Sequence, residues 1–233
     1  MIPLRDTIRS YSFPVINWSF IILNGLVFFY QISLPQGELL DFIRTFGLVP
    51  SRINLSEPTS WVPLFSNMFL HGGFFHILSN MWILYIFGDN VEDRMGSGRY
   101  LIFYVLSGLA ANFLQLYFAQ GSNVPIIGAS GAIAGVLGGY FLLFPRARVI
   151  TLILLFIFPW FVELPAVIYL GFWFVSQVFS GLFSLGMPSG GAMGGIAWWA
   201  HIGGFAFGFL MVNFFRRRQR AYTRWYQDEY WPW

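Results

Sequence analysis

The chain has 233 residues, of which 57% are hydrophobic, 21% aromatic and only 10% charged. Soluble domains carry about 25% charged residues, so this composition excludes an ordinary soluble domain and predicts an integral membrane protein. The formal net charge is +3. No cysteine is present, which excludes a disulfide framework, a Cys-ligated zinc site and a thiol nucleophile.

Several apolar runs are long enough to cross a membrane, which takes about twenty mostly apolar residues. In chain order they are 15–33, 74–91, 99–119, 128–145, 163–183 and 198–215. The apolar stretch 149–161 is short for a span and contains Pro159, so we expect a loop lying in the membrane interface. The predicted fold class is an all-α membrane protein, a bundle of six transmembrane helices.

The basic residues, all arginine, indicate how this bundle is oriented. With six spans, one side of the membrane receives Arg5, Arg9, Arg94, Arg99, Arg146, Arg148 and the five arginines of the tail. The other side receives only Arg44 and Arg52. Because positive charge is retained inside, both termini are predicted to be cytoplasmic. We expect a single domain over 1–233 with its core at about 15–215, in a prokaryotic inner membrane.

The basic and aromatic tail, residues 216–233, directly follows the last apolar run. A basic cluster in that position suits an anionic lipid surface better than a nucleic acid. We therefore expect the lipid bilayer as a partner and no nucleic acid.

A glycine-rich segment, GASGAIAGVLGG at 128–139, surrounds the hydroxyl of Ser130 with small residues. Small residues let a neighbouring helix approach the backbone closely. Taken alone, the segment is better explained by tight packing, with Ser130 bonded to its own preceding turn.

Other polar residues make a catalytic interpretation stronger. His76 and Asn80 are four residues apart and share one helix face, and His201 lies near the start of the last run. Polar side chains inside a span are costly and need a reason. In the six-span topology these side chains and Ser130 share one depth just below the outer surface.

Serine, histidine and asparagine are the residue types that acyl transfer requires. A serine becomes nucleophilic when a base takes its proton, and a partly buried imidazole is expected to be neutral and able to do so. An asparagine amide, a histidine N–H and the backbone N–H of the serine can stabilise the resulting oxyanion. The acidic residues near the spans fall at the predicted cytoplasmic ends, which favours a Ser–His dyad over a triad.

These residues together resemble the rhomboid family of intramembrane serine proteases over about Ser60 to Phe209. The motifs that carry the resemblance are His71-x4-His76-x3-Asn80, Glu92-x-Arg94, Gly128-Ala129-Ser130-Gly131 and Ala200-His201-x-x-Gly204. The resemblance implies that Ser130 is the nucleophile and His201 the general base, while His76 and Asn80 line the oxyanion hole. It implies cleavage of transmembrane segments of other proteins near the outer face, at a site open to the extracytoplasmic side, without metal or cofactor.

Supporting roles are expected for the remaining motif residues. His71 is predicted to be a hydrogen-bonding residue of a loop-to-helix junction, and Glu92 and Arg94 a structural pair at a helix end. Gly128, Gly131 and Gly204 are expected to shape the site and its packing. One departure concerns Ala134, which stands where some rhomboids carry a tyrosine against the catalytic histidine.

Other interpretations remain beside the protease. The strongest is a rhomboid-like protein that binds or chaperones membrane helices without cutting them, although such a relative would be expected to lack Ser130 or His201. Three histidines could bind zinc, but no HExxH helix or intramembrane carboxylate accompanies them. A transporter is disfavoured because no inverted repeat is visible. Gln177, in the fifth run, is predicted to make an interhelical hydrogen bond.

Overall fold

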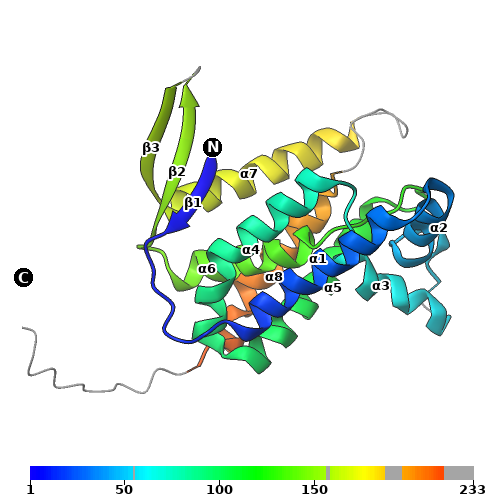
Figure 1. The fold of residues 1–233 in the computed structure, drawn as a ribbon, viewed down its shortest axis with the longest axis horizontal. Coiled ribbons are helices and arrows are strands. Elements are labelled where there is room, and N and C mark those ends of the chain that lie inside the picture. The colour runs from blue at the N-terminus through cyan, green and yellow to red at the C-terminus, as the bar shows by residue number, and fades with distance from the viewer. Residues whose placement is uncertain (55, 156–157, 187–195, 218–233) are drawn as a thin grey trace, which may run out of the picture.

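The computed structural model describes residues 1–54, 56–155, 158–186 and 196–217, and it is mostly helical. Its elements are β1 (Ile2–Asp6), α1 (Val15–Ser33), α2 (Gln36–Phe46), α3 (Val62–Ser66), α4 (Phe74–Met95), α5 (Ser97–Phe118), α6 (Ser130–Leu143), β2 (Arg148–Leu155), β3 (Phe158–Pro165), α7 (Ala166–Leu185) and α8 (Trp198–Phe215). Short 3-10 turns occur at Pro50–Arg52, Pro58–Trp61 and Asn67–Phe69. The long helices form a bundle, with the sheet at one end and α2 and α3 at the other (Figure 1).

Four of the described helices are long and apolar enough to cross a membrane: α1, α5, α7 and α8. Each of the other two predicted runs also holds a helix. However, α6 has only 14 residues, and α4 has 22 residues but ends in the charged run Asp89–Arg94. The chain is therefore an integral membrane protein with four candidate spans among its described residues, and the number six stays a prediction.

The stretch predicted as an interface loop is instead a β-hairpin, so the protein is not all-α. Strands β2 and β3 pair antiparallel, and β1 adds to the free edge of β2, with Ile2 opposite Leu152. The sequence RVITLILL is rich in β-branched residues, which favour strands. The hairpin also shortens the fifth predicted run, because Glu163 lies on β3 and α7 begins only at Ala166.

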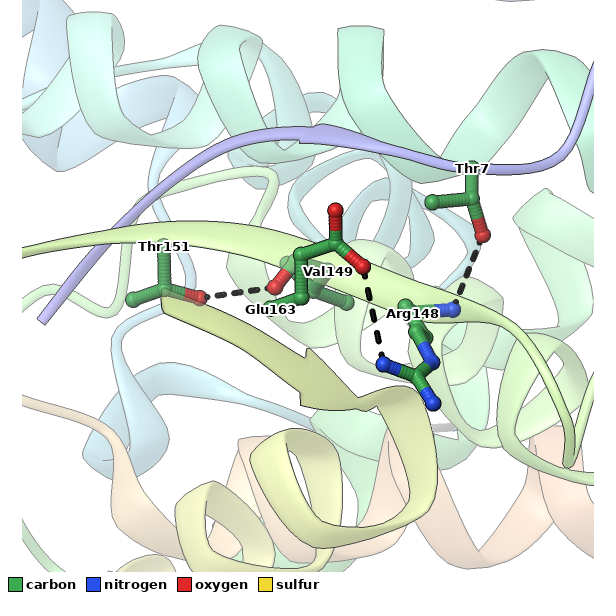
Figure 2. Close-up of polar contacts among 5 residues, drawn as sticks. All are labelled: Thr7, Arg148, Val149, Thr151 and Glu163. Carbon is green, nitrogen blue, oxygen red and sulfur yellow. Dashed lines mark hydrogen bonds and ion pairs between the residues drawn. The ribbon is translucent and has the colours of Figure 1, made fainter. Parts of the chain in front are cut away.

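Polar contacts tie the N-terminal arm to this hairpin, as Figure 2 shows. The backbone N–H of Arg148 donates to the Thr7 hydroxyl at 3.0 Å, and the N–H of Thr7 donates to the Arg148 carbonyl. The Arg148 guanidinium faces the Glu163 carboxylate at 3.6 Å across the two strands. Both charged side chains are exposed, so this ion pair contributes little free energy.

Several arginine-bearing segments meet at one end of the bundle. The N–H of Arg217, just after α8, donates to the carbonyl of Arg94 near the end of α4. Ser12, in the N-terminal arm, donates from its N–H and hydroxyl to the Asp93 carboxylate. The segments assigned to the cytoplasm in the six-span topology are thus neighbours, while their orientation in the membrane stays a prediction.

Glu92 and Arg94 contact different partners rather than each other in the contacts of the described residues. The buried Glu92 carboxylate accepts from the N–H groups of Ile16 and Asn17 at 3.1 and 2.8 Å and from the Ser97 hydroxyl at 2.6 Å. It therefore caps the first turn of α1, where a negative charge is favourable. The Arg94 guanidinium lies over the Phe144 ring, 5.3 Å from its centroid.

Helix α8 packs backbone to backbone on α6. The Cα of Gly204 lies against the carbonyl of Gly131, and that of Gly208 against the carbonyl of Gly135, with no room for a Cβ atom. Such contacts depend on small residues and bring helix axes unusually close. The close approach predicted from the glycine-rich segment is confirmed.

Candidate active site

Ser130 and His201 are brought into hydrogen-bonding contact by the glycine packing of α6 and α8. Ser130 is the first residue of α6, and His201 lies in the first turn of α8. The Nε2 atom of His201 is 2.9 Å from the Oγ atom of Ser130. The first N–H groups of α6 have no partner within the helix, so the positive end of its dipole lies beside the serine.

His76 lies beside the loop that precedes Ser130. Its Nδ1 atom accepts a hydrogen bond from the N–H of Gly72 at 3.3 Å, so in the neutral ring Nε2 carries the proton. A Cβ placed on Gly128 would lie 2.8 Å from that Nε2 and 3.7 Å from the Ser130 Oγ. Gly128 also has a φ of +127°, a conformation that other residues rarely adopt. Glycine at 128 therefore leaves room for the imidazole N–H next to the serine.

The loop before Ser130 is fixed by amides that the sequence analysis did not identify. The N–H of Gly128 donates to the Asn67 carbonyl at 2.9 Å. The buried side chains of Asn67 and Asn112 are 2.9 Å apart, and Asn112 also donates to the Leu64 carbonyl. The signal that could have found them is the presence of two amides in otherwise apolar segments.

Asn80 lines the same cavity as Ser130 and His201, and it carries an unpaired hydrogen-bond donor. The side chain is buried, and its Nδ2 atom has no hydrogen-bond partner among the described residues. A buried donor without a partner costs about 1–3 kcal/mol. The cavity has a volume of about 180 Å³, and its inner wall is apolar, formed by residues that include Phe87, Leu137 and Leu170.

A larger cavity of about 560 Å³ adjoins the first between α4 and α7. The two cavities share the lining residues Ser79, Ile83, Tyr169 and Trp173. Residues 1–3 line the larger one, where the indole N–H of Trp82 donates to the Pro3 carbonyl at 2.6 Å. The N-terminal strand thus lies against the gap between the two helices.

His71 makes its hydrogen bonds through its backbone rather than its ring. Its N–H donates to the Gln31 Oε1 at 3.0 Å, and the Gln31 amide donates to its carbonyl at 3.2 Å. The ring packs edge-on against the His76 ring, with centroids 5.1 Å apart. His71 is therefore at the predicted junction and also supports the His76 ring. In the part of the chain that the structure describes, no group of three or more metal-ligating side chains comes together.

A comparison with known protein families places this site within a known domain model. Residues 58–218 match the model of the rhomboid domain. The chain belongs to the rhomboid family. Its matched region contains the serine and histidine in contact, the unpaired amide and the loop that presents them.

Named relatives of this rhomboid include proteases. The chain is 34% identical over 129 residues to the putative rhomboid protease YdcA of Bacillus subtilis, covering 55% of this chain and 61% of the relative. It is 32% identical over 125 residues to the rhomboid protease GluP of the same organism, covering 54% and 24%. It is 34% identical over 105 residues to rhomboid protein 1, mitochondrial, of Saccharomyces cerevisiae, covering 43% and 29%. The chain thus spans between about a quarter and three fifths of these relatives.

Proposed function

We propose that this rhomboid is an intramembrane serine endopeptidase in which Ser130 and His201 form a catalytic dyad. The observation that carries the proposal is the 2.9 Å contact between Nε2 and Oγ in a cavity that also holds the unpaired Asn80 amide. A nucleophile, a base and a free donor in one cavity are the groups that peptide hydrolysis needs.

The chemistry follows from these positions. The Ser130 Oγ attacks the scissile carbonyl carbon while its proton passes to the His201 Nε2. The oxyanion formed in this step accepts hydrogen bonds from the Asn80 amide, the His76 Nε2–H and the N–H of Ser130. The C–N bond then breaks as His201 returns the proton to the leaving amine, and a water molecule hydrolyses the acyl-enzyme by the reverse sequence. Neither metal nor cofactor takes part.

The proposed substrates are transmembrane segments of other proteins that enter between α4 and α7. The larger cavity lies in this gap and adjoins the cavity of the dyad. The small volume and the apolar wall of the inner cavity suit a small side chain next to the cleaved bond. We further propose six spans with both termini cytoplasmic and cleavage near the extracytoplasmic face, in a prokaryotic inner membrane.

The test is labelling of the purified protein with a fluorophosphonate that reacts with activated serines. We expect labelling of the native chain and none of Ser130→Ala or His201→Ala, with each variant checked for its thermal unfolding temperature. Cleavage of a model transmembrane substrate is expected to follow the same order, and the double variant should lose little more than either single one. A native chain that binds substrate helices but neither labels nor cleaves would favour the non-cutting, helix-binding interpretation.

The topology is tested separately, with a reporter enzyme that is active only outside the cytoplasm. Fused after Trp233, it is expected to be silent. An active reporter would overturn the six-span arrangement. Product termini mapped by mass spectrometry are expected near the outer boundary of the substrate segment, and cuts at its cytoplasmic end would contradict the proposed location of the site.

A further inference from the structure

We infer that Gln177 is a positioning residue that fixes the tautomer of His201, an inference that rests on the proposed function. Its side-chain oxygen, Oε1, is 2.8 Å from the Nδ1 atom of His201, on the opposite side of the ring from Ser130. Gln177 is on α7, whereas His201 is on α8, so the contact joins two helices. The glutamine side chain is buried.

The hydrogen bonds of the glutamine amide determine which of its atoms faces the ring. Its Nε2 atom donates to the Trp173 carbonyl at 3.2 Å and lies 2.9 Å from the Ser176 hydroxyl. With the amide nitrogen used on α7, the amide oxygen is the atom left for His201. This oxygen can only accept a hydrogen bond. The proton of the neutral imidazole is therefore on Nδ1, and the lone pair of Nε2 faces the Ser130 Oγ.

This tautomer is the one that a general base requires. A ring protonated on Nε2 would present a donor to the serine and could not take its proton. In addition, when the ring becomes cationic after proton transfer, the Nδ1–H bond to Gln177 becomes charge-assisted and stronger. Gln177 thus stabilises the state in which the oxyanion forms, although it touches neither the substrate nor the reacting atoms.

The arrangement also explains how His201 is held although residue 134 is an alanine with no ring to pack against it. Some rhomboids carry a tyrosine against the catalytic histidine at this position, whereas here the alanine lines the cavity. His201 is instead flanked by the rings of Trp173 and Trp198, with centroids 5.8 and 6.3 Å away. The tryptophans limit the tilt of the imidazole, and Gln177 fixes which nitrogen carries the proton.

Three variants separate positioning from simple packing. Gln177→Met keeps the length of the side chain and removes the oxygen that accepts from His201. Gln177→Glu keeps an accepting oxygen and adds a negative charge. Gln115→Met is the matched control, because Gln115 Oε1 accepts from the N–H of Ala200, the neighbour of His201, but does not touch its ring. All variants are compared by thermal unfolding, fluorophosphonate labelling rate against pH, and kcat and KM.

For Gln177→Met we expect a labelling rate and kcat lower by about 10- to 100-fold, the effect of losing one hydrogen bond to a charged group, with KM little changed. Gln177→Glu should recover most of the rate, and the low-pH limb of its profile should lie at higher pH because a carboxylate favours the protonated ring. Gln115→Met should lower the unfolding temperature and leave the shape of the pH profile unchanged. Equal losses in Gln177→Met and Gln177→Glu, without a displaced limb, would overturn the inference.

A measurement without substrate tests the inference independently of protease activity. Two-bond 1H–15N NMR correlations report which nitrogen of a histidine is protonated, and loss of one signal in His201→Ala assigns the ring. We expect the Nδ1–H form in the native protein and loss of this preference in Gln177→Met. A native Nε2–H form would refute the role of Gln177. Failure of the native chain to label with fluorophosphonate would instead refute the proposed protease.

Discussion

Gly204 on α8 touches the backbone carbonyl of Gly131 on α6, and each glycine lies within one helical turn of a member of the proposed dyad. Gly131 directly follows Ser130, and Gly204 is three residues after His201. The distance between Oγ and Nε2 is therefore set by a backbone contact and not by the flexible side chains alone.

Replacing Gly204 with alanine tests this contact. The added Cβ would overlap the Gly131 carbonyl, which cannot rotate away as a side chain would. We expect a loss of at least about 1–3 kcal/mol in the free energy of unfolding and a large loss of labelling at Ser130. Gly25→Ala is the control, because no atom lies within 4 Å of its added Cβ and alanine favours helix. An unfolding temperature of Gly204→Ala equal to that of Gly25→Ala would contradict the prediction.

Asn80→Ala removes the unpaired amide from the cavity. If Asn80 is one donor of the oxyanion hole, kcat should fall by about 10²- to 10³-fold with a small effect on KM. Stability should rise or stay constant, since a buried donor without a partner is removed. Asn24→Ala, a buried amide on α1 that bonds to the Phe20 carbonyl, should leave kcat unchanged. Equal kcat values for the two variants would exclude Asn80 from the chemistry.

Glu92→Gln tests the cap on α1. The carboxylate accepts two backbone N–H groups and a hydroxyl, and an amide can offer only one oxygen in its place. We expect a loss of about 1–3 kcal/mol in the free energy of unfolding, measured by thermal denaturation in detergent. Asp93→Asn, next in sequence and bonded to Ser12 nearer the surface, should cost less. The reverse order of the two losses would show that the cap on α1 is not the main role of Glu92.

Docking of the N-terminal strand should depend on pH through Asp6. Its carboxylate accepts hydrogen bonds from the Tyr140 hydroxyl and the Asn90 amide, and Asp6 and Asp89 both line a further cavity beside the start of α1. Burial raises the pKa of Asp6 from 3.8 to about 6, chiefly through desolvation. A raised folded-state pKa means that docking is favoured most below about pH 4 and weakens as pH rises through about 6.

A spin label on an introduced cysteine can measure this docking, because the sequence itself contains no cysteine that would also be labelled. Placed on Ile2→Cys, the label should show a larger mobile fraction at pH 7.5 than at pH 5. Asp6→Asn, which imitates the neutral carboxyl, should remove most of this dependence. If the Asp6→Asn chain keeps the full pH response, another group controls the strand.

Much of the helical architecture could be predicted from apolar runs, because each of the six runs contains a helix. The hairpin could not be predicted in this way, since 149–161 is apolar on both faces and shows no alternation that separates a strand from a loop or a buried helix. The end of α4 was also predicted too early. Three charged residues, 92–94, follow Val91, yet the helix continues to Met95, and Glu92 finds its hydrogen-bond partners on α1 and α5.

In the candidate site, residue types and spacing were sufficient to place Ser130, His201, His76 and Asn80 in one group. The interhelical hydrogen bond predicted for Gln177 is confirmed, but its partner depends on how α7 packs on α8, which no local pattern contains. The roles of Asn67 and Asn112 were missed for the same reason, because they act across segments that lie far apart in the sequence.

The pairing of β1 with β2 has a consequence for how the protein is made. Strand β1 precedes every other described element, yet its partner edge, around Leu152, is translated only after α6. Until then β1 is an unpaired strand, the kind of segment that associates with other chains. The gap between α4 and α7 is lined by residues 1–3 only once this late pairing has formed. Because α7 is translated after β2, the partner edge of β1 is already available when the second wall of this gap is made, so the gap and its cover can form together.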